Sequence, residues 1–175
     1  MASDLQSTLS GAKRSGTQSK GAIRVATPDD LATICAQRRA MFDDMRVGTP
    51  SELDAGDVAF KSWVVNRIAT GEYRGWFALN ARDEIIAGAG LWIATMPPGP
   101  RDHTERRGYV MNVYTHPDYR QRGLARRLMN VIMEWCRANQ IRTMMLHASD
   151  KGRALYESLG FKQTNEMRIK LRGDA

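Results

Sequence analysis

One segment, residues 109–135, constrains the fold most, because a strand pattern, a turn and an amphipathic helix follow one another directly. Tyr109–Thr115 is rich in β-branched and aromatic residues, and His116-Pro117-Asp118 ends it as a turn. Apolar residues then recur at helical spacing, at Leu124, Leu128, Val131, Ile132 and Trp135. A strand that passes through a short turn into a helix predicts a mixed α/β domain.

Strand and helix patterns also occupy the rest of the chain. The elements expected before this segment are a strand at 23–26, helices at 31–45 and 57–70, and a hairpin of strands at 76–79 and 84–93. Those expected after it are a strand at 141–148, a helix from 151 to Gly160, and strands at 161–163 and 167–171. Residues 96–107 are interpreted as a loop, because their three prolines cannot serve a central strand.

Length and composition predict one soluble domain with an N-terminal extension. A chain of 175 residues fits a single core, which we place at 23–175. Residues 1–22 are rich in Ser, Gly, Thr, Gln and Lys, so we expect a disordered basic tail there. We expect no membrane segment, since the apolar runs are too short to span a bilayer.

The two cysteines favour a reducing compartment. Cys35 and Cys136 both lie in helical patterns, and although they can pair, a small secreted scaffold usually carries more cysteines. With no apolar leader segment either, the cytoplasm is the expected location. The three histidines show no ligand-like spacing with the cysteines, so no metal is expected.

The formal net charge of +7 indicates an anionic partner but leaves its class open. Much of the charge falls between Arg101 and Arg127. The helix expected near Gly123 has no Ser, Thr, Asp or Asn in the usual capping place, so its first N–H groups lack a side-chain acceptor. Cations also oppose the helix dipole at this end, and a bound polyanion would resolve both conflicts. Capping by water beside a solvated arginine face explains the same residues equally well.

The segment Arg120-x-x-Gly123-x-Ala125, after a strand and Pro117-Asp118-Tyr119, resembles the acetyl-CoA signature of the Gcn5-related N-acetyltransferase (GNAT) superfamily. A second stretch, Ala154 to Phe161, resembles the later helix of that family and its Gly-Phe exit. The resemblance implies a mostly antiparallel central sheet with two splayed parallel strands and about four helices. It also implies acetyl transfer from acetyl-CoA, as co-substrate, directly to a primary amine.

The same resemblance assigns site residues. Tyr156 takes the place of the tyrosine that protonates the leaving thiolate. The residues assigned to acetyl-CoA are Val113, Tyr114, Thr115, Arg120, Gln121, Arg122, Gly123, Leu124, Ala125, Arg126 and Ser149. Ser149 stands where the family often has an asparagine, and Asn112 stands where some members have a basic carboxylate. The general base therefore stays open among His116, Asp150 and a water held by Asn112 and Tyr114.

The sequence also leaves the chemical class of the acetyl acceptor open. Acidic residues between 42 and 57 favour a cationic amine, whereas Arg101, Arg106 and Arg107 favour an acidic acceptor or the 3′-phosphate of CoA. Two other functions are kept as alternatives: a CoA-binding regulatory protein without turnover, and a basic nucleic-acid-binding protein. Nucleic acid and membrane are not the partners we expect. A homodimer is an open alternative, since dimers are frequent in the family.

Overall fold

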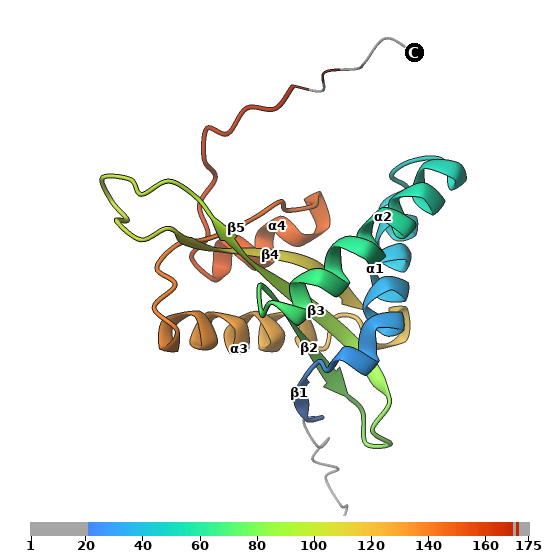
Figure 1. The fold of residues 1–175 in the computed structure, drawn as a ribbon. Coiled ribbons are helices and arrows are strands. Elements are labelled where there is room, and N and C mark those ends of the chain that lie inside the picture. The colour runs from blue at the N-terminus through green and yellow to red at the C-terminus, as the bar shows by residue number, and fades with distance from the viewer. Residues whose placement is uncertain (1–20, 170, 172–175) are drawn as a thin grey trace, which may run out of the picture.

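The computed structural model describes residues 21–169 and 171, which form a five-stranded sheet with helices on both faces (Figure 1). In chain order the elements are β1 (Ile23–Val25), α1 (Leu31–Met45), α2 (Pro50–Ala69), β2 (Tyr73–Leu79), β3 (Ile85–Thr95), β4 (Arg106–Thr115), α3 (Leu124–Ala138), β5 (Met144–Leu146) and α4 (Asp150–Ser158). Single 3-10 turns, Pro28–Asp30 and Pro117–Tyr119, precede α1 and α3. Of the tail predicted at 1–22, all but Gly21 and Ala22 lies outside the described residues.

The strands lie in the sheet in their chain order, β1-β2-β3-β4-β5. The first three neighbouring pairs are antiparallel, and β4 pairs with β5 in parallel. This confirms the expected fold class, a mostly antiparallel sheet that carries two parallel strands among four helices.

Strand β2 is buried on both faces, and its alternation divides the core into two layers. Tyr73, Phe77 and Leu79 pack with Ile34 of α1 and with Phe60 and Val64 of α2. The intervening Trp76 and Ala78 pack on the other face, with Leu128, Met129 and Ile132 of α3. Helices α1 and α2 therefore cover one face of the sheet, and α3 covers the other.

Helix α2 begins earlier than the sequence pattern predicted, at Pro50 instead of residue 57. Its start is a capping box, in which Thr49 Oγ1 accepts from the Glu52 N–H and the Glu52 carboxylate accepts from the Thr49 N–H at 2.7 Å. Pro50 at the first helical position suits this geometry. The apolar stripe that guided the prediction begins further along, because the first two turns are largely exposed.

The predicted strands at 161–163 and 167–171 are wrong for the described residues, since 161–169 and 171 form no strand. This segment leaves the body of the protein after α4 (Figure 1). The alternating Met167, Ile169 and Leu171 are 79–94% exposed. A period-two pattern forms a strand only against a partner edge, and these residues have none in the described chain. Strand β5 is likewise shorter than the predicted 141–148, whereas Gly160 has the expected positive φ, 93°.

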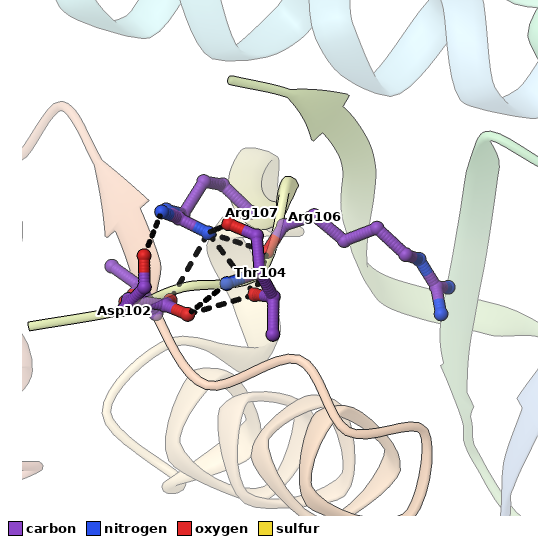
Figure 2. A network of polar contacts seen from close by, with 5 residues as sticks. Asp102, Thr104, Arg106 and Arg107 are labelled. Atoms are coloured by element: carbon purple, nitrogen blue, oxygen red, sulfur yellow. Dashed lines mark hydrogen bonds and ion pairs between the residues drawn. The ribbon is translucent and has the colours of Figure 1, made fainter. Parts of the chain in front are cut away.

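The loop predicted at 96–107 ends earlier, at residue 105, because Arg106 and Arg107 pair with β3 as the start of β4. A polar network joins this loop to Arg107 and to Thr143, the residue before β5; Figure 2 shows its part around Asp102, Thr104 and Arg107. The Asp102 carboxylate lies 3.1 Å from Arg107 Nη1 and accepts from the hydroxyl groups of Thr104 and Thr143 at 2.8 and 2.6 Å. Together these donors hold the pKa of Asp102 at about 2. The Gly108 N–H also donates to the Thr143 carbonyl at 3.0 Å. The network therefore fixes β5 against β4 at the end where the two strands first meet.

Candidate active site

Strands β4 and β5 stay paired over a short length. Their parallel register begins at Gly108 with Met144 and ends at Val110 with Leu146, yet β4 continues for five more residues, to Thr115. Past Leu146 the chain turns into His147 and then α4, so no described segment pairs as a strand with the rest of β4 on this side. This is the splay expected between the two parallel strands.

A β-bulge in β4 lies at the point where the strands part. The register with β3 shifts between Gly88 and Gly90, and Asn112 has a φ of 54°. Met111 packs in the layer under α1 and α2, whereas Val113 packs in the layer under α3. Between them, Asn112 turns its side chain toward α1, where its Oδ1 accepts from Arg38 Nη1 at 2.8 Å.

The N-terminus of α3 offers main-chain N–H groups without a side-chain cap. Gly123 occupies the N-cap position with a left-handed φ of 73°, and Gln121 has a φ of 59°. The first turn of a helix has N–H groups that lack intrahelical acceptors, and here these belong to Leu124, Ala125 and Arg126. Apart from its chain neighbours, no atom of the described residues lies within 4 Å of where a Cβ on Gly123 would be. These N–H groups are therefore open to a hydrogen-bond acceptor from outside the helix.

The arginines around this turn are mostly held by other protein groups. Arg120 pairs with Asp44 of α1 and donates from Nε to the Thr115 carbonyl at 3.0 Å. Arg122 donates to the Asp118 carbonyl at 2.8 Å and stacks over the Tyr119 ring. In α3, Arg126 donates to Ser158 Oγ and Arg127 to the Gly21 carbonyl. The donors left open at this turn are therefore main-chain amides more than a free cluster of arginines.

Tyr156 and Ser149 both belong to α4 and its cap. The Tyr156 ring is half-buried against the core layer under α3, 6.0 Å from the Phe161 ring. Burial raises the pKa of its hydroxyl, which has no hydrogen-bond partner within the described chain. Ser149 caps the helix by accepting from the Gly152 N–H at 3.2 Å. The phenol is thus kept protonated, and the serine oxygen is engaged in capping.

Three residues of β4 were also assigned to acetyl-CoA. Val113, Tyr114 and Thr115 are all partly exposed at the unpaired end of the strand. Burial raises the pKa of the Tyr114 hydroxyl. The Thr115 carbonyl already accepts one hydrogen bond from Arg120, so one lone pair stays open to a ligand.

The face of the sheet under α1 and α2 carries polar side chains that the sequence did not single out as site candidates. Tyr109 lies beside His147, with 2.5 Å between its hydroxyl and Nδ1, and its ring centroid is 6.1 Å from that of Trp92. Arg38 reaches the same region from α1. One signal existed for Arg38: it lies seven residues after Leu31 and four after Ile34, so a cation interrupts an apolar helical stripe.

Neither a metal centre nor a membrane span is found in the part of the chain that the structure describes. No cluster of three or more His, Cys, Asp or Glu side chains within it is placed to hold a metal ion. None of its helices is both long and apolar enough to cross a bilayer.

Comparison with known proteins gives the class to which this fold and site belong. A model of the acetyltransferase (GNAT) family matches residues 38–161, from within α1 to just past α4. The chain belongs to this family of acetyltransferases, whose acyl donor is acetyl-CoA. No match was found among curated protein sequences.

Solved structures agree with this assignment. A GCN5-related N-acetyltransferase from Ralstonia eutropha JMP134 is 33% identical with a TM-score of 0.81, over 87% of this chain and 99% of that one. A predicted acetyltransferase from Clostridium acetobutylicum, solved with acetyl-CoA, is 26% identical with a TM-score of 0.78, over 86% and 95%. Glucosamine-6-phosphate N-acetyltransferase from Arabidopsis thaliana shares the fold, at 15% identity and a TM-score of 0.59, over 86% and 97%.

Proposed function

We propose that this protein transfers an acetyl group from acetyl-CoA directly to the nitrogen of a primary amine. The observation that carries the proposal is the uncapped N-terminus of α3, which follows the unpaired end of β4. One end of acetyl-CoA is a polyanion and the other is a narrow thioester arm. Open amides at a helix start, beside a strand end whose main chain is not paired on one side by any described strand, suit both parts.

The binding mode follows from these two features. The N–H groups of residues 122–126 take the pyrophosphate, favoured by the positive end of the helix dipole. Arg122, which lacks a carboxylate partner within 4.0 Å among the described residues, adds charge beside them. The pantetheine arm runs along the exposed end of β4 and bonds to main-chain groups of Val113 and Thr115. Gln121 and Tyr114 flank these contacts.

The transfer needs one nucleophile, one oxyanion donor and one acid. The neutral amine attacks the thioester carbon, so that a C–N bond forms while the C–S bond breaks. The Val113 N–H lies beside the bulge and steadies the developing oxyanion. Tyr156 gives its proton to the departing thiolate, the amine loses one proton to solvent, and Tyr156 regains one proton from solvent before the next turnover.

The cysteines support direct transfer over an acyl-enzyme intermediate. Cys136 is buried under α3, and burial raises the pKa of its thiol to about 11. Burial also raises the pKa of Cys35, which packs against the opposite layer. A thiol that stays protonated is a poor nucleophile, so neither residue suits a covalent step.

The test is calorimetric titration of acetyl-CoA into the wild type and two variants, Gly123→Asp and Gly123→Asn. Both side chains tolerate a left-handed backbone and nearly match in shape, so the pair differs in charge alone. We expect the aspartate variant to lose binding at least about 100-fold relative to the asparagine variant.

Three other outcomes are informative. Equal affinity of the two variants for acetyl-CoA would mean that the pyrophosphate does not bind at the start of α3. Absence of acetyl-CoA binding by the wild type would overturn the acetyltransferase proposal. Tight binding without CoA release for any amine would instead support a CoA-binding regulatory protein.

A further inference from the structure

Arg38 is a half-buried cation with no carboxylate partner in the described part of the chain, and it faces the site from α1. No carboxylate there lies within 4.0 Å of its guanidinium. The next residue, Arg39, is engaged by three carboxylates at 2.7 to 3.3 Å: Asp43, Asp54 and Asp57. Asp57 influences Arg38 only at longer range. Two adjacent arginines thus have opposite electrostatic surroundings.

The acidic residues near α1 are committed to other partners. Asp44 pairs with Arg120, and Glu52 closes the capping box of α2. The carboxylates that suggested a cationic acceptor therefore form contacts within the protein. Arg107 is likewise neutralised, by Asp102. Among the described residues, Arg38 and Arg67 of α2 both lie at this face without a carboxylate within 4.0 Å, and of the two it is Arg38 that donates to a side chain of β4.

Aromatic rings surround the Arg38 guanidinium. Its carbon lies 4.6 Å from the centroid of Phe42 and 4.2 Å from that of Phe60. Desolvation by these neighbours lowers its pKa. A cation in a water-poor setting attracts an anion more strongly than one in bulk water. The guanidinium carries five N–H groups, and among the described residues only Nη1 has a hydrogen-bond acceptor.

Arg38 is also tied to the reacting end of the site. Its one hydrogen bond goes to Asn112, the residue before Val113, and consecutive Cα atoms are about 3.8 Å apart. Asn112 is 6% exposed, and among the described residues its Nδ2 has no hydrogen-bond acceptor within 3.5 Å. It lines a cavity of about 10 Å³, roughly one water molecule, with Gln37 and Tyr73. The bulge thus places a buried amide between Arg38 and this small cavity, one residue before Val113.

We infer that the acceptor is a primary amine that also carries a carboxylate, and that Arg38 binds this carboxylate. The inference rests on the proposed acetyltransferase function and names the substrate class of that site. The planar fork of a guanidinium matches a carboxylate in a bidentate pair. The short path from Arg38 through Asn112 to Val113 suits a small separation of amine and carboxylate, as in an amino acid.

The experiment compares acceptors in matched pairs, each an amino acid and its carboxamide, by following CoA release at saturating acetyl-CoA. The proteins are the wild type, Arg38→Gln and the control Lys61→Gln, which removes one exposed charge from α2. We expect the wild type to prefer the free acids. In Arg38→Gln, kcat/KM should fall at least about tenfold for the acids and little for the carboxamides. Lys61→Gln should match the wild type.

Acetyl-CoA titration on the same three proteins separates the two proposals. Unchanged acetyl-CoA affinity in Arg38→Gln, with selective loss of the acids, supports the inference. Equal turnover of acids and carboxamides by the wild type overturns it and leaves the acetyltransferase proposal intact. Failure of every acid as an acceptor, in a protein that binds acetyl-CoA, overturns it as well. Failure to bind acetyl-CoA at all overturns both.

Discussion

At the scale of single residues, burial raises the pKa of one tyrosine of the candidate site and of both cysteines. Tyr156 is desolvated against the core, so its pKa lies above the ordinary value and its hydroxyl stays protonated at neutral pH. That state suits a group that donates a proton. The pKa values of Cys35 and Cys136 are raised for the same reason, which removes their thiolate forms.

For Tyr156→Phe we expect kcat to fall roughly 100-fold while acetyl-CoA affinity stays unchanged, because only the proton donor is lost. Steady-state kinetics and calorimetric titration measure the two quantities. Tyr119→Phe serves as a control, since it also removes a phenol hydroxyl, one that accepts from Asn80 at 3.2 Å. An equal loss of kcat in both variants, or none in Tyr156→Phe, would argue against the acid role.

The residues of the site differ in how far the sequence alone could reveal them. Gly123 can be identified from local sequence, because it lies between a turn and a helical pattern at a position where a capping side chain would be usual. Arg38 and Asn112 lie 74 positions apart and meet only because α1 packs across β4. The φ of 54° at Asn112 comes from a register shift against β3, which no local pattern encodes.

At the scale of elements, the start of α2 depends on its cap, because its first turns bury little. Thr49→Ala removes the side-chain acceptor of the Glu52 N–H, so we expect the free energy of unfolding to fall by about 1 kcal/mol. Urea denaturation measures this change. Ser62→Ala, on an exposed position within the same helix, should be neutral or slightly stabilising. Similar losses in both variants would mean that the cap contributes little.

The sequence predicts elements with strong local patterns well. It predicts less well the strands that depend on pairing with a distant part of the chain. Helix α3 follows from its apolar spacing, and the β2–β3 hairpin follows from two apolar runs joined by a turn. The predicted helix was shorter than α2 because the first residues of α2 lack an apolar stripe, and only the capping box of Thr49 and Glu52 indicates that the helix begins there. The strands expected after Gly160 failed because their alternation needs a neighbouring edge, which lies outside local sequence information.

At the scale of the whole molecule, the Asp102 network links acid sensitivity to the arrangement of β4 and β5. Its folded pKa of about 2 lies below the ordinary 3.8, so the carboxylate stabilises the fold fully above pH 3.8. That contribution is lost as pH falls toward 2. Asp102→Asn should therefore unfold more easily than the wild type at neutral pH, and the difference should shrink between pH 4 and 2.

Urea denaturation of both proteins across this pH range checks the expectation. Asp118→Asn is the control, because its side chain is 82% exposed and should change stability little at any pH. A stability difference between Asp102→Asn and the wild type that stays constant from pH 7 to pH 2 would contradict the proposed linkage.

The bulge in β4 has a consequence for how such a site can change during evolution. Because Met111 and Asn112 both face α1 while Val113 faces α3, Asn112 acts as an inserted residue within an otherwise regular alternation. Deleting it would restore the alternation and leave Met111 and Val113 in their present layers. A lineage can therefore add or remove the polar contact to Arg38 by a change of one residue in chain length, with both core layers preserved.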